Sequence, residues 1–259
     1  MAMSRRARID DLGAAVLLPG SPARVVSLVP SLTEAVEVSL PGLLAGATDY
    51  CTHPEGLAVP RVGGSKYPVL DRVLELEPDL VLANAEENRP QEVRALRDNG
   101  IPVWVTEAAG TVPAALASLR RMFTEAFAAP VPDWLERAEQ VWEHGDPVRA
   151  RAVIPVWRRP WVVLGSATFA GDVLLRLGIA NVYARAEQRY PRPGLEELRA
   201  SGAELVVLPD EPYAFTAEDG PECFPGLPCV LVSGRHLTWC GPSLLEAHEL
   251  LREQLSSPL

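Results

Sequence analysis

The segment Leu70-Asp-Arg-Val-Leu-Glu-Leu-Glu-Pro-Asp-Leu-Val-Leu-Ala83 aligns without gaps, at an offset of 125 residues, to Leu195-Glu-Glu-Leu-Arg-Ala-Ser-Gly-Ala-Glu-Leu-Val-Val-Leu208. Each copy combines a polar helical pattern with an apolar run that is typical of a buried strand. Solenoid repeats recur every ~20 to 50 residues, so two copies this far apart predict two similar lobes. The alternative is a chance similarity between two amphipathic helix–strand pairs.

Further short apolar runs alternate with helical patterns along the chain, at 24–28, 79–83, 102–106, 161–164, 204–208 and 229–233. Apolar strands separated by helices predict parallel sheets that are covered on both faces. Helices are expected to begin at the capping box Ser31-Leu-Thr-Glu34 and at Thr111 and Thr168. A helical stripe of apolar residues runs from Trp134 to Trp142.

These patterns predict an α/β fold of two Rossmann-like lobes with parallel sheets joined by a single backbone helix. We expect an N-terminal lobe at 22–130, the connecting helix at 131–150 and a C-terminal lobe at 151–259. The 259 residues suffice for two domains, and 47% hydrophobic with 22% charged residues is the balance of a globular protein.

A net charge of −10 argues against a nucleic-acid partner, because phosphate contacts need clustered Lys and Arg. The sequence as given has neither a secretory apolar segment nor a run long enough to span a membrane, so we expect a cytoplasmic protein without membrane insertion. Cys51, Cys223, Cys229 and Cys240 are expected to be free thiols. The chain also lacks the P-loop, the G-x-G-x-x-G and the G-x-S-x-G motifs of common enzyme classes.

Several segments resemble, in order, the helical-backbone metal receptor superfamily, which includes periplasmic solute-binding proteins for cobalamin, haem and ferric siderophores. The resemblance rests on 24–35, 46–54, 60–64, 70–83, 165–172, 177–182 and 195–208, within a total span of about 22 to 256. It implies two α/β lobes with the ligand between them. It also implies docking to the permease of an ABC transporter through Asp71 and Glu196, although first-turn acids also stabilise a helix without any transporter.

Ligands of parallel sheets bind beyond the carboxyl ends of the strands, where acidic and aromatic residues cluster in this chain. By the internal alignment Glu86 and Glu211 are equivalent, and with Glu87 and Asp210 they could clamp a cation; the alternative is that these acids point into water. The predicted ligand wall contains Tyr50, Tyr67, Ser166, Tyr213, Phe215 and Trp239. The alternative for the aromatic residues is packing within their own lobe.

His53 and His236 are the candidate ligands to the metal of a bound chelate, whereas a structural zinc site is not expected from their spacing. The sequence therefore predicts a binding protein for a cobalamin-like or metal-chelate ligand. The alternative is a cytosolic enzyme that has reused the cleft between the lobes for a small cationic or metal-bound substrate.

Overall fold

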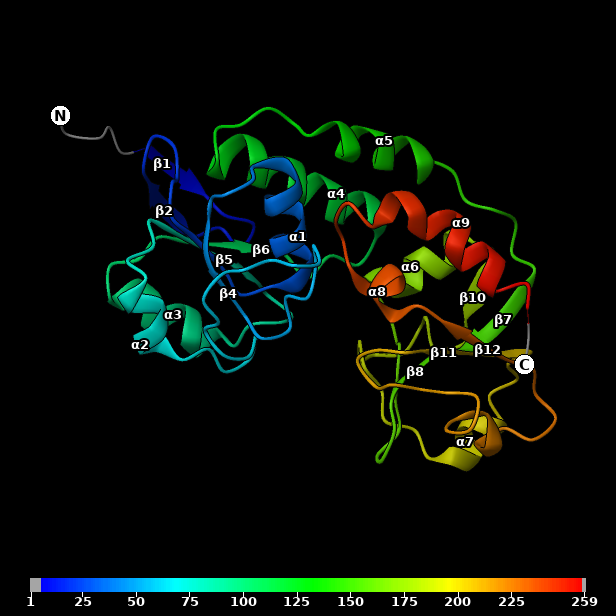
Figure 1. The fold of residues 1–259 in the computed structure, drawn as a ribbon. Helices are drawn as coiled ribbons and strands as arrows, with labels where there is room; N and C mark the ends of the chain where they lie inside the picture. The colour runs from blue at the N-terminus through cyan, green and yellow to red at the C-terminus, as the bar shows by residue number, and fades with distance from the viewer. Residues whose placement is uncertain (1–5, 258–259) are drawn as a thin grey trace. The chain divides into compact units, whose positions relative to one another are not determined.

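The chain forms two compact units in the computed structural model, which describes residues 6–257. Of these residues, unit 1 contains 6–108, 116–136 and 240–242, and unit 2 contains 109–115, 137–239 and 243–257. Each unit has its own four-stranded parallel sheet with helices packed around it (Figure 1). The predicted α/β class with two parallel sheets is therefore confirmed.

The sheet of unit 1 has the strand order β4-β3-β5-β6. Its strands are β3 (Val25–Ser27), β4 (Leu44–Ala47), β5 (Leu80–Asn84) and β6 (Val103–Thr106). Alternate residues of these strands face α2 (Leu70–Glu75) and α3 (Pro90–Asp98), so that Val26, Val81 and Val103 share a core cluster with Val73 and Leu96. The opposite face packs against α1 (Pro30–Ser39) and the π-helix η1 (Met122–Ala126).

An antiparallel hairpin of β1 (Arg6–Ile9) and β2 (Ala15–Leu18) precedes the sheet of unit 1. Arg97 of α3 donates to the Asp10 carboxylate at 2.7 Å, and the Asp11 N–H donates to the Val105 carbonyl at 3.2 Å. These contacts fasten the hairpin turn beside β6, at the edge of the sheet.

The sheet of unit 2 has the strand order β10-β7-β11-β12. Its strands are β7 (Ala150–Val153), β10 (Ile179–Asn181), β11 (Leu205–Pro209) and β12 (Cys229–Val232). Its helices are α6 (Phe169–Arg176), α7 (Leu195–Arg199), the 3-10 turn η2 (Pro221–Cys223), α8 (Gly234–Thr238) and α9 (Leu244–Gln254). A separate antiparallel hairpin, β8 (Pro155–Trp157) and β9 (Val162–Val163), packs beside β11.

The internal repeat is confirmed by the structure. Helices α2 and α7 begin at Leu70 and Leu195, and strands β5 and β11 begin at Leu80 and Leu205, so both pairs keep the offset of 125. Both strands are third in the order of their sheet. The same helix and strand therefore have the same place in both units.

Two local expectations differ from the structure. The run 161–164 contains β9, which pairs antiparallel with β8 instead of joining the parallel sheet; β7, with exposed Arg151 in its middle, takes that position. Helix α1 begins at Pro30, one residue before the expected capping box, because proline favours the first helical position. Thr111 does cap α4, since its Oγ1 accepts from the Ala114 N–H at 3.3 Å.

Helix α5 (Asp133–Val141) lies within the range expected for the connecting helix. Its residues are divided between unit 1 (133–136) and unit 2 (137–141), and those of α4 (Val112–Arg121) are divided as well. The exact lobe boundaries given above stay a prediction. Within 6–257, no helix combines the length and apolar character that crossing a membrane requires.

Candidate functional site

Two asparagines organise the loop after β5 in unit 1. Asn88 is buried; its side-chain amide donates to the Leu28 carbonyl at 3.2 Å and to the Ser65 carbonyl at 2.7 Å, and its Oδ1 accepts from the Asn84 N–H at 2.7 Å. Asn84 donates to Thr106 Oγ1 at 3.0 Å and accepts from the Glu86 N–H at 2.8 Å. These amides tie the ends of β3, β5 and β6 and the loop at Ser65 into one rigid edge.

Two exposed tyrosines lie on this edge of unit 1. Tyr50 is 65% exposed and Tyr67 is 67% exposed. A side chain added at Gly64 would contact the Tyr50 ring at 3.4 Å, the Tyr67 N–H donates to the Gly64 carbonyl at 3.2 Å, and the Arg89 guanidinium lies 4.7 Å from the centre of the Tyr67 ring. Both predicted aromatic residues are therefore close to Gly64 and open to solvent, as a stacking surface requires.

The acidic and histidine candidates of unit 1 lie in the same loops. Glu86 is exposed and Glu87 is half-buried. His53 is half-buried, and its Nδ1 lies 3.0 Å from the Thr52 hydroxyl. The neighbouring Cys51 thiol is buried between the Thr33 and Thr48 hydroxyls, and burial raises its pKa. Cys51 therefore supports the loop and is poorly suited to ligand chemistry.

In unit 2 the loop after β11 is held against α8. The Asp210 carboxylate accepts from the Gly234 N–H at 2.6 Å. A Cβ at Gly234 would lie 2.4 Å from Glu211 Cγ and 2.6 Å from the Glu211 backbone N and O, so only glycine permits this approach. Burial, followed by the neighbouring Asp210 carboxylate, raises the pKa of Glu211, and Arg235 opposes the shift. Glu211 is thus partly desolvated beside the exposed Asp210.

The aromatic residues of unit 2 divide into exposed and buried rings. Tyr213 is half-buried, and its ring lies 5.6 Å from that of Trp157, which is 44% exposed. Phe215 is only 3% exposed and stacks on Trp161, and Trp239 is 8% exposed with the Arg235 guanidinium above it. Packing within unit 2 thus accounts for Phe215 and Trp239 without a ligand.

Sequence reasoning missed Trp157. The signal was present, because Trp157 follows the buried Pro155 and Val156 at the end of a short apolar run beside Arg158. It lies on the hairpin that packs beside β11.

The structure does not favour His236 as a ligand to a metal. Its Nδ1 lies 2.7 Å from Ser233 Oγ and its Nε2 lies 2.9 Å from Glu246 Oε1, so both ring nitrogens are already engaged. In the described part of the chain, no group of three or more His, Cys, Asp and Glu side chains is placed to hold a metal ion.

The remaining predicted residues lie at the ends and starts of elements. Ser166 is half-buried, and its N–H donates to the Gln188 carbonyl at 3.4 Å. Asp71 and Glu196 are both exposed in the first turns of α2 and α7, and Glu196 pairs with Arg199 at 2.6 Å. Glu86 belongs to unit 1 and Glu211 to unit 2. Their meeting at one ligand, like the docking role of Asp71 and Glu196, stays a prediction.

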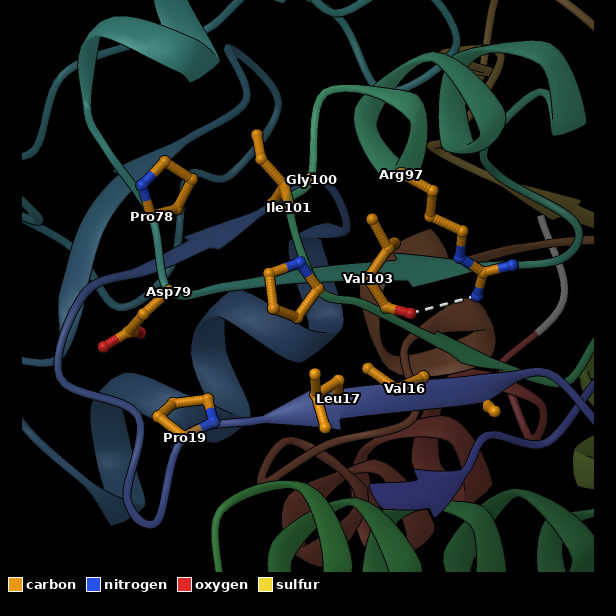
Figure 2. Close-up of a pocket in the computed structure, with 11 residues that line it drawn as sticks. Val16, Leu17, Pro19, Pro78, Asp79, Arg97, Gly100, Ile101 and Val103 are labelled. Carbon is orange, nitrogen blue, oxygen red and sulfur yellow. Dashed lines mark hydrogen bonds between the residues drawn. The ribbon is translucent and has the colours of Figure 1, made fainter. Parts of the chain in front are cut away.

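A hollow of about 530 Å³ lies at the other end of the unit 1 sheet, where β5 and β6 begin. Figure 2 shows Leu17 and Val16 of β2 on one side and Ile101 and Val103 on the other, with Arg97 reaching the Val103 carbonyl. Asp79 accepts from the Ala23 and Arg24 N–H groups. Because its charged groups already serve the fold, this hollow is a weaker candidate than the carboxyl edges.

Comparison with known proteins adds to this geometry. No family model matches the chain. The vitamin B12-binding protein of Pectobacterium carotovorum is 24% identical over 251 residues, which cover 91% of this chain and 89% of that protein. The vitamin B12-binding protein of Vibrio cholerae is 23% identical over 202 residues, covering 74% of this chain and 72% of that one.

Solved structures show the same fold. The periplasmic vitamin B12-binding protein BtuF of Vibrio cholerae superposes with a TM-score of 0.72 and 18% identity, over 91% of this chain and 97% of BtuF. The periplasmic heme-binding protein BhuT, in complex with two hemes, superposes with a TM-score of 0.71 and 22% identity, over 92% of this chain and 98% of BhuT. The resemblance is therefore confirmed in sequence for the vitamin B12-binding proteins and in fold for the haem-binding protein.

Proposed function

We propose that the protein is a solute-binding protein that holds a cobalamin-like or other metal-chelate ligand between its two units. The similarity to vitamin B12-binding proteins spans both units, with 91% of the chain aligned to the Pectobacterium protein. Both units present polar and aromatic loops at the carboxyl ends of equivalent parallel sheets, where ligands of such sheets bind. These two findings support binding in preference to an enzyme of a common motif class.

The observation that carries the proposal is the pair of exposed tyrosines on unit 1. Tyr50 and Tyr67 are two large rings exposed in the same set of loops, and burying such rings against a ligand is favourable. The Asn84 and Asn88 amides hold the surrounding loops in place before any ligand arrives. A flat macrocycle that stacks on these rings would therefore find a preorganised surface.

Titration of the purified protein with cyanocobalamin and, separately, with hemin tests the proposal by tryptophan quenching and calorimetry. Tyr50→Ala combined with Tyr67→Ala should weaken binding of the tighter ligand by about fivefold or more, because two stacking contacts worth ~0.5–1.5 kcal/mol each add up to at least ~1 kcal/mol. Leu17→Ala is the matched control, since Leu17 is 49% exposed on β2, at the hollow of Figure 2. Equal affinities in the wild type and the double variant would show that the tyrosines do not contact the ligand.

The acidic residues receive a separate test. Glu86→Gln with Glu211→Gln preserves shape and removes two carboxylates, one from each unit. If the acids clamp a ligand of positive or metal character, the double variant should lose affinity by about tenfold or more, whereas a purely aromatic site would keep its affinity. Unchanged binding of cyanocobalamin and hemin by the folded double variant would therefore refute the acidic clamp. The proposal of an aromatic binding surface would not be affected.

The comparisons favour a location different from the one expected from the sequence. BtuF and BhuT, which share this fold, are periplasmic proteins. We therefore favour action outside the cytoplasm, with Asp71 and Glu196 as the residues that would meet an ABC permease. Fractionation of the native host, with immunodetection of the protein in the periplasmic or extracellular fraction, tests the location; exclusive recovery with cytosolic markers would restore the cytoplasmic expectation.

A further inference from the structure

Three side chains at the end of β12 form a hydrogen-bonded chain that ligand binding leaves unexplained. Ser233 Oγ lies 2.7 Å from His236 Nδ1, and His236 Nε2 lies 2.9 Å from Glu246 Oε1. Ser233 comes directly after β12, His236 lies in α8 and Glu246 lies in the first turn of α9. A hydroxyl, an imidazole and a carboxylate in this order are the parts of an activated serine nucleophile.

Helix capping, the simplest structural explanation, does not account for Ser233. It occupies the N-cap position of α8, where a serine hydroxyl usually accepts from a backbone N–H, yet in the described structure its side chain makes no such cap bond. The first N–H of the helix, that of Gly234, is satisfied by the Asp210 carboxylate instead. The Ser233 hydroxyl thus faces the His236 imidazole instead of a backbone N–H of the helix.

The partners of the imidazole determine its tautomer. The pKa of Glu246 is lowered, first by its hydrogen bond to His236, so this carboxylate is ionised and only accepts. We therefore assign the ring proton of the neutral imidazole to Nε2, which leaves the Nδ1 lone pair facing the Ser233 hydroxyl. This is the arrangement in which a histidine can take a proton from a serine.

We propose that Ser233 is a nucleophile toward activated carboxylic esters, with His236 as its general base and Glu246 as the positioning residue. In the first step Ser233 Oγ forms a bond to the acyl carbon, its proton passes to His236 Nδ1, and the alkoxide leaves with that proton. In the second step water attacks the acyl-serine by the same route, releases the carboxylic acid and restores the hydroxyl. Water is the only other reactant.

The surroundings keep the three groups in place. The side chain of His236 is 12% exposed and that of Glu246 is 63% exposed. The Ser233 N–H donates to Gln254 Oε1 of α9 at 3.0 Å, which fixes the backbone of the nucleophile. Glu246, the partner of the imidazole, also pairs with Arg235 at 3.4 Å. Ser233 itself is half-buried.

A fluorophosphonate probe tests the proposal on the full-length protein, because it reacts covalently with an activated serine much faster than with an ordinary serine. Peptide mapping by mass spectrometry should place the adduct on Ser233 and not on Ser256, whose hydroxyl donates to the Glu253 carbonyl at 2.7 Å. Ser233→Ala should abolish the adduct, while Ser256→Ala should leave the labelling rate unchanged. An adduct absent from Ser233 in the folded protein would overturn the proposal.

Two further variants separate activation from a structural role. His236→Gln should slow labelling at Ser233 at least about 100-fold, the usual contribution of a general base. Glu246→Gln keeps a hydrogen-bond acceptor but removes the charge that favours imidazolium, so the midpoint of its pH–rate profile should move to lower pH. The unfolding curve of each variant confirms that it is folded. Equal labelling rates in wild type and His236→Gln would show that Ser233 is not activated, whereas slow hydrolysis of p-nitrophenyl acetate that requires Ser233 would support the full cycle.

Discussion

Units 1 and 2 build the same sheet and hold their carboxyl-edge loops by different chemistry. In unit 1 the neutral amides of Asn84 and Asn88 bind the loop after β5. In unit 2 the Asp210 carboxylate holds the loop after β11 to α8, and Arg158 pairs with Asp219 and Glu222 nearby. The difference teaches that the repeated helix and strand determine the topology, while the loops remain free to acquire different chemistry.

The largest expected effect on stability is at the close approach of Gly234 to Glu211 in unit 2. Gly234→Ala would place a Cβ 2.6 Å from the Glu211 backbone, which cannot move aside as a side-chain tip can. We expect a loss of about 3 kcal/mol in the free energy of unfolding, measured by urea denaturation. Gly194→Ala is the control, because its φ is −71° and the described structure has no other atom within 4 Å of the added Cβ. Equal stabilities of the two variants would contradict the close packing of this loop.

An intermediate effect on stability is expected from the side-chain amide of Asn88 in unit 1. Asn88→Ala removes three hydrogen bonds at a buried position and should cost about 2 kcal/mol of unfolding free energy. Asn88→Asp keeps the acceptor for Asn84 but turns an oxygen toward the Leu28 and Ser65 carbonyls. Its deficit should therefore shrink at acid pH, where the carboxyl is protonated and can donate. A deficit that does not change with pH would mean that the loop rearranges around the new residue.

The smallest effect concerns the pH dependence of stability that Glu211 of unit 2 causes. Because burial and then Asp210 raise the pKa of Glu211 in the folded state, the unfolded chain releases this proton first as pH rises, and stability falls until the folded carboxyl has also ionised. Glu211→Gln should remove that fall, with a gain at pH 7 of at most about 1 kcal/mol, since water partly screens a half-buried group. Thermal unfolding between pH 4 and 8 measures it, with Glu86→Gln on the exposed position of unit 1 as control. A gain that is the same at every pH would refute the carboxyl as its source.

Much of the fold was accessible from local pattern. The runs at 79–83, 102–106, 204–208 and 229–233 became β5, β6, β11 and β12, because continuous apolar runs are what doubly covered strands require. The run at 161–164 was assigned to the wrong sheet, since a short apolar segment has the same appearance in a hairpin as in a parallel sheet. β7 was missed because Arg151 interrupts its apolar pattern.

The candidate site was accessible only in outline. Placing Glu86, Asp210 and Glu211 at strand ends needed no more than strand positions and the rule for parallel sheets. Whether a ring in those loops is open or covered depends on residues far along the chain. Tyr50 and Tyr67 are exposed, whereas Phe215 is covered by Trp161, more than 50 positions away.

Periodicity acts over neighbouring residues, so the chain alone specified two α/β units, their repeat and the loops that follow each strand. Burial, hydrogen-bond partners and shifts in pKa arise from groups brought together by folding, and these needed three dimensions. Folding joined Ser233 to Glu246 through His236, packed Glu211 onto Gly234 and enclosed Asn88 beneath the loop at Ser65. Apart from the local Ser233–His236 bond, these contacts cross between elements, and no local period in the sequence encodes such a pairing.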